Sequence, residues 1–239
     1  MVPTVFKGKP VHSYRTNFPL EEYPISENGM WLSGRHYGLD WSDVITKNGI
    51  CYGEVSGYRY GGVTERRVGQ GNLPSGTEAA GDYDDPTAIL VGTWGKNQHV
   101  KAKVSSKNPT DKYFQEIELR LRCTIRPHYC AGYEVFFRPL KTEKGYAEIC
   151  RWNGQFSKGL FWTSLVRHEG PEFGIKDGDV IEATAIGNEI KGFINGVEVT
   201  SVTDDFFASG APGIGFNFGV GYTNSDFGIT SYEVETYDD

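Results

Sequence analysis

Residues 177–218 constrain the fold of this chain more than any other stretch. They hold four strand-like runs: Val180–Ile186, Glu189–Ile194, Val197–Val202 and Gly213–Phe218. The pairs Gly187-Asn188 and Asn195-Gly196 separate the first three runs. Asn-Gly between alternating runs is a strong hairpin signal, because a type I′ turn needs residues that tolerate positive φ. The stretch therefore predicts a β-meander within an antiparallel β protein.

The clearest single strand elsewhere is Glu116–Ile125. Its odd positions are apolar and its even positions polar, with Ile117, Leu119, Leu121, Cys123 and Ile125 on one face and Glu116, Glu118, Arg120, Arg122 and Thr124 on the other. Similar short runs recur along the chain at spacings of about ten residues, and no segment sustains a helical period. This pattern predicts an all-β fold built as a two-sheet antiparallel β-sandwich, with helix confined to short turns.

The two parts of the chain differ in character. Residues 1–30 carry prolines at positions 3, 10, 19 and 24 and predict an irregular, extended N-terminal arm. Residues 31–239 contain no internal repeat, low-complexity tract or linker, and we expect them to form a single domain. A chain of 239 residues is within the usual range for one all-β domain.

The charge pattern limits the partners. The net charge is −7, with acidic and basic residues interspersed. Nucleic acid is an unfavoured partner, because neutralising phosphates requires clustered Lys and Arg side chains.

No apolar run reaches membrane-spanning length, so we expect no membrane insertion. The N-terminus lacks the apolar core of a signal peptide. Either a signal has been removed, or the protein is made and assembled in a cytoplasm.

The four cysteines leave two alternatives open. Cys51, Cys123, Cys130 and Cys150 have no Cys-x-x-Cys spacing, which argues against a zinc site. Cys123 and Cys130 flank an expected turn at 126–129 and could face each other across a hairpin. They form either a disulfide or a pair of buried free thiols.

Several of these segments resemble the concanavalin A-like lectin and glucanase (laminin-G-like) jelly-roll superfamily. The likeness rests on Tyr133–Arg138, Ala147–Trp152, Asp177–Val199, Pro212–Phe216 and Asp226–Val234, and it covers roughly residues 85–236. It implies two curved antiparallel sheets packed back to back, in a family that commonly handles glycans on the concave face or at the loop rim. It also implies that a structural calcium ion is frequent.

Catalytic motifs of that superfamily are absent from the sequence. Retaining glycosidases of this fold carry a Glu-x-Asp-x-x-Glu strand, because the acid and the nucleophile must lie about 5 Å apart. Glu116 and Glu118 share a strand face, but Arg120 and Arg122 continue the row, and we expect them to keep both acids ionised. A polysaccharide lyase would need a cation or amide beside the uronate and a His or Tyr base. The candidates for such a site are Arg120, Arg122, Arg138, His36, His128 and Tyr133.

Binding sites have two further sets of candidates. Asp82, Asp84 and Asp85 form an acidic turn with oxygen ligands suited to calcium, as does the shorter pair Asp177 and Asp179. An aromatic platform that stacks on sugar rings could use exposed side chains, with Arg and Gln taking the hydroxyl groups. The expected platform residues are Tyr58, Arg59, Tyr60, Arg66, Arg67, Gln70, Trp41 and Trp94.

Two functions follow as hypotheses. The first is a non-catalytic glycan-binding or surface-interaction module, located extracellularly or on the surface of a virion or phage particle. It requires no cofactor beyond an optional structural Ca²⁺. The second is a polysaccharide lyase or glycoside hydrolase that acts on an acidic polysaccharide from the concave face. A structural subunit that uses the N-terminal arm to assemble a homo-oligomer or particle is a third alternative.

Overall fold

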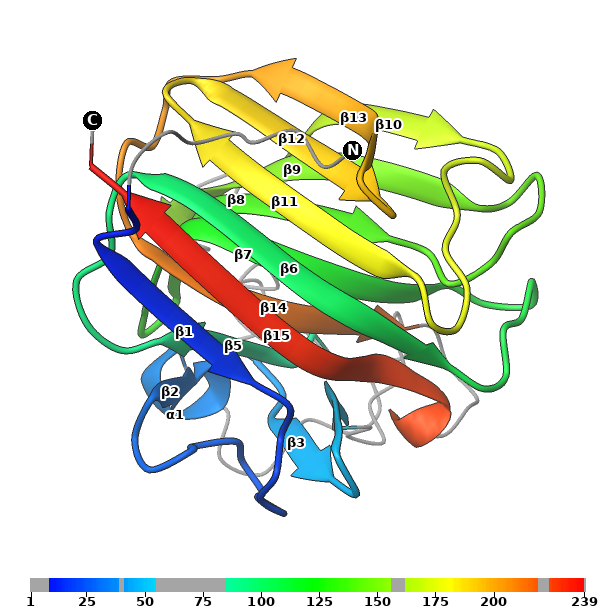
Figure 1. Cartoon of the computed structure of the whole chain (residues 1–239), viewed down its shortest axis with the longest axis horizontal. Coiled ribbons are helices and arrows are strands. Elements are labelled where there is room, and N and C mark those ends of the chain that lie inside the picture. Colours follow the sequence, from blue (N-terminus) through cyan, green and yellow to red (C-terminus); the bar gives the residue numbers. More distant parts are fainter. Residues whose placement is uncertain (1–8, 39–40, 55–84, 156–161, 219–223, 239) are drawn as a thin grey trace, which may run out of the picture.

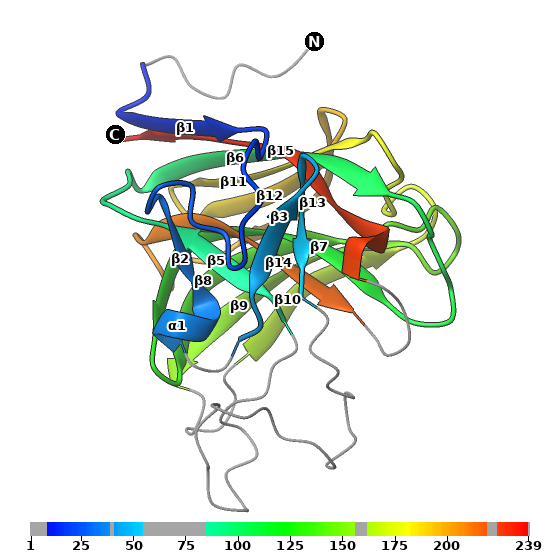
Figure 2. The ribbon, with the colours of Figure 1, turned by 90° about the horizontal axis from the view of Figure 1, so that it is seen from below.

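The computed structural model describes residues 9–38, 41–54, 85–155, 162–218 and 224–238. They form two antiparallel sheets stacked face to face, as the two layers in Figure 2 show. The predicted two-sheet antiparallel β-sandwich is confirmed. Helix is limited to two short elements in these residues, α1 (Gly34–Gly38) and the 3₁₀ turn η1 (Asn224–Asp226). Neither is long enough or apolar enough to cross a membrane.

The first sheet, sheet A, faces the viewer in Figure 1. Its strand order is β13-β12-β11-β6-β15-β4-β3, and β1 pairs with β15 as well. These strands are β1 (His12–Thr16), β3 (Val44–Lys47), β4 (Ile50–Gly53), β6 (Asn97–Ser106), β11 (Val180–Ile186), β12 (Glu189–Ile194), β13 (Val197–Thr203) and β15 (Phe227–Tyr237).

The second sheet, sheet B, has the order β10-β9-β8-β7-β14-β5-β2. Its strands are β2 (Trp31–Ser33), β5 (Thr87–Leu90), β7 (Gln115–Arg126), β8 (Tyr129–Phe137), β9 (Tyr146–Gln155), β10 (Trp162–Glu169) and β14 (Ala211–Phe218). Neighbours in sequence pair as hairpins from β7 through β10, whereas β14 enters the sheet on the other side of β7.

The main core fills the space between the two sheets. Alternate residues of each strand point inward, so β7 contributes Ile117, Leu119 and Leu121, and β6 contributes Val100 and Ala102. All five side chains are almost completely buried. The remaining face of sheet B carries a smaller apolar cluster of its own.

Residues 177–218 form a three-stranded meander and not a four-stranded one. β11, β12 and β13 pair in order within sheet A, with positive φ at Gly187, Asn195 and Gly196 in the two turns. β14 then crosses to sheet B and pairs with β7. The prediction of a β-meander is therefore right for the first three strands and wrong for the returning one.

A β-bulge in β7 reverses the predicted alternation near its end. The register between β7 and β8 shifts between Leu121 and Thr124, and Arg122 has a φ of 52°. As a result Cys123 joins the cluster on the outer face of sheet B, where the sequence pattern predicted it to point inward. Gly132 on β8 allows the bulge, because a Cβ there would lie 2.7 Å from the Cα of Cys123.

The four cysteines are buried free thiols. The sulfur atoms of Cys123 and Cys130 lie 3.9 Å apart, which is a thiol hydrogen bond rather than a disulfide. Of the two alternatives left open by the sequence, the structure contains the free thiols.

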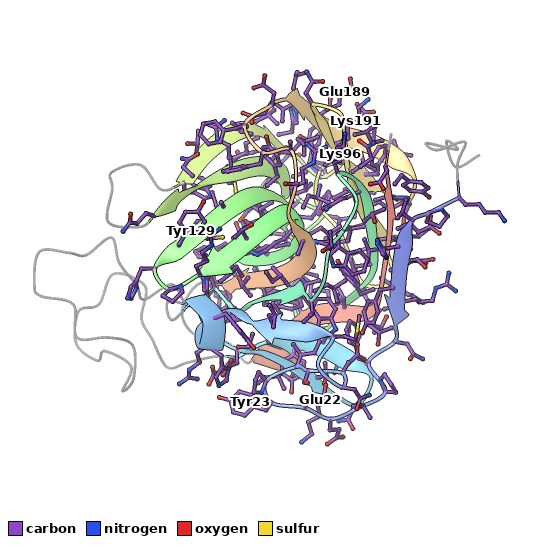
Figure 3. All side chains as sticks on the ribbon, turned by 90° about the vertical axis from the view of Figure 1, so that its left-hand side faces the viewer. Glu22, Tyr23, Lys96, Tyr129, Glu189 and Lys191 are labelled. Carbon is purple, nitrogen blue, oxygen red and sulfur yellow. The ribbon has the colours of Figure 1, made fainter. Side chains whose placement is uncertain are left out.

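The described part of the N-terminal arm runs along the sandwich. Its strand β1 pairs with β15, and a single bridge joins Glu22 to Thr46. Phe18 and Ile25 anchor the arm, since both side chains are buried in the main core. In Figure 3, Glu22 and Tyr23 of the arm lie at the opposite end of the molecule from Glu189.

Candidate functional site

A row of charged side chains crosses the outer face of sheet B. Glu116, Glu118 and Arg120 point outward from β7 because the alternate positions fill the core, and Glu134 and Glu148 extend the row onto β8 and β9. All five are buried, and Arg120 has no exposed surface at all. Charged side chains are rarely enclosed unless they are paired, so this row is the strongest candidate for a site in the described residues.

Arg120 is the centre of the row. Its Nη2 donates to Glu118 Oε2 at 2.8 Å, and its Nη1 forms an ion pair with Glu134 Oε2 at 2.9 Å. The carboxylate of Asp85 lies 3.4 Å from Nη2. Gly215 on β14 leaves the space for these groups, because a Cβ there would lie 2.0 Å from Glu118 Oε2.

Two tryptophans close over the same guanidinium group. The Arg120 guanidinium carbon lies 5.1 Å from the centre of the Trp41 ring and 5.6 Å from that of Trp152. The two rings pack edge to face 5.0 Å apart, and Trp152 Nε1 donates to Glu134 at 2.7 Å. Cation–π contacts and charge-assisted hydrogen bonds therefore replace the water that the charged groups lose. We name Arg120, Glu118, Glu134, Asp85, Trp41 and Trp152 the Arg120 cluster.

The pKa values of the two acids of β7 are raised, whereas the sequence led us to expect that Arg120 and Arg122 keep both acids ionised. Burial raises the pKa of Glu116 to about 8, and the hydrogen bond from Tyr146 opposes this shift only in part. Burial also raises the pKa of Glu118 well above its ordinary range, and Asp85 and Glu134 add to that effect. The reason is geometric: the bulge removes Arg122 from the row, and desolvation outweighs the attraction of Arg120.

The Arg120 cluster does not fit a metal ion. Oxygen atoms of Asp85, Glu118 and Glu134 lie within 4.8 Å of one another, as a cation site requires. The cation there is already the guanidinium of Arg120, which contacts all three carboxyl groups. Asp82 and Asp84, the other members of the predicted acidic turn, lie outside the described residues.

The second acidic pair stabilises turns. Asp177 accepts the backbone N–H of Ser106, and Asp179 accepts that of Lys176 and the side-chain amide of Asn195. These hydrogen bonds are typical of aspartates that satisfy turn backbone.

The six residues named as lyase candidates do not form one group. The Arg122 guanidinium donates to the carbonyls of Lys96, Phe207 and Gly187, and that of Arg138 to the carbonyls of Lys144, Thr110 and Tyr113, whereas Arg120 lies in its own cluster. Tyr133 points into the core side of sheet B. His36 is exposed on α1, and His128 is half-buried in the turn between β7 and β8.

Two of the expected platform residues, Trp41 and Trp94, belong to the described part of the chain. Trp41 is fully buried in the Arg120 cluster, so it is no exposed stacking surface. Trp94 is half-buried, donates to the Val91 carbonyl and contacts His12 edge to face. The remaining candidates, Tyr58, Arg59, Tyr60, Arg66, Arg67 and Gln70, lie outside the described residues.

An exposed aromatic that the sequence reasoning missed lies in the connection between β13 and β14. Phe206 is 58% exposed, and the guanidinium carbon of Arg151 lies 4.2 Å from its ring centre. Arg151 Nη1 forms an ion pair with Asp204 at 2.5 Å, and its Nε donates to Asn153 at 2.8 Å. Asp204 also accepts the backbone N–H of Phe206.

The apolar ring of Phe206 is therefore exposed to solvent beside the polar side chains of Arg151 and Asp204. The signal in the sequence was the pair Phe206-Phe207 placed between two strands, where turn residues are expected. Phe207 packs on the core and against Tyr133, which leaves Phe206 exposed. We name Phe206, Arg151, Asp204 and Asn153 the Phe206 surface.

Comparison with known proteins identifies the fold. No family model matches the chain, and no curated protein matches its sequence. Among solved structures, carbohydrate-binding module CBM66 from Bacillus subtilis superposes with a TM-score of 0.51 at 10% identity, covering 90% of this chain and 98% of that one.

Two further structures superpose over nearly their whole length. A prokaryotic β-1,3-1,4-glucanase (lichenase) derived from a mouse hindgut metagenome has a TM-score of 0.52 at 12% identity, covering 94% of this chain and 99% of that one. A structure described among endo-acting O-glycanases of the human gut microbiota has a TM-score of 0.54 at 10% identity, with the same coverage of 94% and 99%. Identities this low establish the architecture alone. This chain has the concanavalin A-like jelly-roll fold.

Proposed function

We propose that this chain is a non-catalytic carbohydrate-binding module. The burial of the Arg120 cluster supports the proposal that the module is not catalytic. A glycosidase needs an acid and a nucleophile or base that both reach the sugar. Here the side chains of Glu118 and Arg120 are 1% and 0% exposed, and the carboxyl groups of Glu118 and Glu134 are engaged by one guanidinium. The likeness in fold to a carbohydrate-binding module supports the choice of ligand class.

The Phe206 surface is the observation that most supports the proposal of carbohydrate binding. Sugar rings offer an apolar face to an aromatic ring and hydroxyl groups to nearby polar side chains. Phe206 provides such a ring, and its hydrogen-bonded neighbours Arg151, Asp204 and Asn153 provide the polar groups. A ring that is fixed before binding loses little conformational freedom when the ligand arrives, which favours affinity.

The F206A variant is expected to bind its polysaccharide about tenfold more weakly, equivalent to about 1.4 kcal/mol. The expected loss reflects the apolar contact area that the ring offers to a sugar. Isothermal titration calorimetry against a polysaccharide that binds the unaltered protein measures the effect. Y37A is the matched control, because Tyr37 is 50% exposed on α1 and takes no part in the Phe206 surface. Unchanged affinity in F206A would place the binding surface elsewhere.

A glycoside hydrolase is the alternative, and one observation favours it. The raised pKa of Glu116, to about 8, gives sheet B a carboxyl group that is protonated at neutral pH, as a general acid must be. Release of reducing ends from a polysaccharide by the protein, abolished in both E116Q and E118Q, would establish the hydrolase and refute the non-catalytic module.

A further inference from the structure

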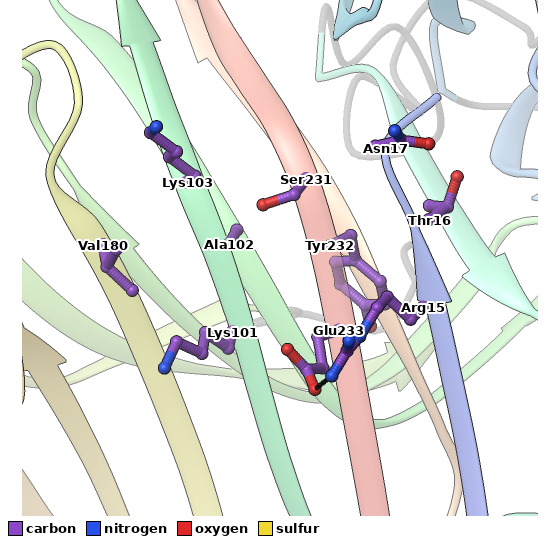
Figure 4. A pocket seen from close by; sticks show the side chains of 10 residues that line it. All are labelled: Arg15, Thr16, Asn17, Lys101, Ala102, Lys103, Val180, Ser231, Tyr232 and Glu233. Atoms are coloured by element: carbon purple, nitrogen blue, oxygen red, sulfur yellow. Dashed lines mark hydrogen bonds and ion pairs between the residues drawn. The ribbon is translucent and has the colours of Figure 1, made fainter. Parts of the chain in front are cut away.

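A groove lies on the outer face of sheet A, the sheet opposite to the Arg120 cluster. It has a volume of about 520 Å³ and is lined by side chains of β1, β15, β6 and β11 and by Asn17, which follows β1 (Figure 4). Its charged lining residues are Arg15, Lys101, Lys103 and Glu233. A groove of this size accommodates a ligand of one or two sugar units, by the usual range of small-molecule sites.

The sequence of β6 places the two lysines on this face. Val100, Ala102 and Val104 alternate with them and fill the core, so Lys101 and Lys103 point away from it. In the strand register, Lys103 lies between Ser231 of β15 and Val180 of β11. These two side chains are short, and they line the groove together with the lysine (Figure 4).

Lys101, two residues before Lys103 on β6, lies in a different row of register partners. This row crosses four strands and alternates in sign: Arg15, Glu233, Lys101 and Glu182. Arg15 forms an ion pair with Glu233, and Glu182 accepts a hydrogen bond from His99 at 2.8 Å or pairs with its charged form. The lysine ammonium of this row therefore has carboxylates on both sides.

Lys103 lacks such a partner. Its register neighbours are a serine and a valine, and no carboxylate of the described residues lies within ion-pair distance of it. The groove as a whole is lined by three cations and one carboxylate, in a chain whose net charge is −7. An excess of positive charge concentrated in one groove attracts anionic groups locally, even on an acidic protein.

We infer that this groove binds an acidic polysaccharide, with a carboxylate group of the sugar paired to Lys103. Ser231 and Asn17 supply hydrogen-bonding groups for the hydroxyls of the same sugar. The inference rests on the proposed carbohydrate-binding function and adds the charge class of the ligand. It concerns a surface separate from the Phe206 surface, which is built from β9 and the connection between β13 and β14.

The test compares one polymer with and without its charge. Polygalacturonate and its fully methyl-esterified form share a backbone, so their affinities for the protein, measured by calorimetry at low salt, isolate the contribution of the carboxylates. We expect polygalacturonate to bind at least tenfold more tightly than the ester, with affinity that falls as NaCl is added. K103Q is expected to bind polygalacturonate about tenfold more weakly than the unaltered protein.

K112Q is the matched control, since Lys112 is exposed before β7 and lies outside the groove. Thermal unfolding of each variant verifies the fold. Equal affinity for the two polymers, or an unchanged affinity in K103Q, overturns the groove inference. In that case binding of a neutral polysaccharide that is weakened by F206A still upholds the proposed function. Binding of inorganic phosphate or of anionic lipid vesicles, with no polysaccharide bound, overturns both.

Discussion

The R120M variant is expected to lose about 3–5 kcal/mol of unfolding free energy at pH 7, because it removes a buried guanidinium from three buried carboxyl groups. Arg120 has no exposed surface and contacts Glu118, Glu134 and Asp85. Methionine fills much of the same volume, so the loss reports the uncompensated charge more than a cavity. Urea denaturation followed by tryptophan fluorescence measures it.

Two further variants separate charge from packing. R15M removes a guanidinium that is 75% exposed and paired with Glu233, and it should leave stability nearly unchanged. R120M/E118Q/E134Q also replaces two of the carboxyl groups that Arg120 contacts, and it should recover part of the unfolding free energy that R120M loses. If R120M were as stable as R15M, the enclosed ion pairs described for the Arg120 cluster would be incorrect.

The stability of the protein is expected to fall as the pH rises from about 5 to about 8, and E116Q should remove part of that fall. Burial raises the pKa of Glu116 to about 8, from 4.5 in the unfolded chain. Between these values the folded state binds a proton that the unfolded state has released, so a rise in pH favours unfolding. The contribution of this group amounts to up to about 5 kcal/mol, at about 1.4 kcal/mol per pKa unit.

Chemical denaturation at a series of pH values tests the sign as well as the size. A glutamine at 116 still offers an oxygen to the Tyr146 hydroxyl, so the hydrogen bond is kept while the titration is removed. E116Q should therefore gain stability relative to the unaltered protein as the pH increases. E198Q is the control at an exposed position of β13, and should leave the pH profile unchanged. Parallel profiles for E116Q and the unaltered protein would mean that Glu116 is ionised at neutral pH.

The fold was predictable from the sequence wherever a few neighbouring residues determine the local structure, as they do in a tight turn. The turns at Gly187-Asn188 and Asn195-Gly196 need positive φ, which only a few residue types adopt easily, and both hairpins form. The crossing of β14 to sheet B was not predictable in the same way. Pairing partners are selected by contacts between distant segments, and Gly213–Phe218 has the same alternation whichever sheet it joins.

The candidate site was harder to predict for a similar reason. Asp85, Arg120 and Trp41 were each singled out in the sequence, but for calcium binding, lyase chemistry and sugar stacking respectively. The structure brings all three into one cluster, because Trp41 and Asp85 precede strands β3 and β5 and lie against Arg120 of β7, which is 35 or more positions away in the sequence. The bulge at Arg122 then separates two arginines that simple alternation places together.

The proposed module binds carbohydrate without cleaving it. Size-exclusion chromatography of the protein incubated with each member of a polysaccharide panel, detecting protein and polymer separately, tests both halves in one run. We expect the protein to elute with at least one polymer, and the length of that polymer, recovered after the protein is removed, to be unchanged. A polymer shortened by the incubation, or a protein that elutes alone from every mixture, would contradict the proposal.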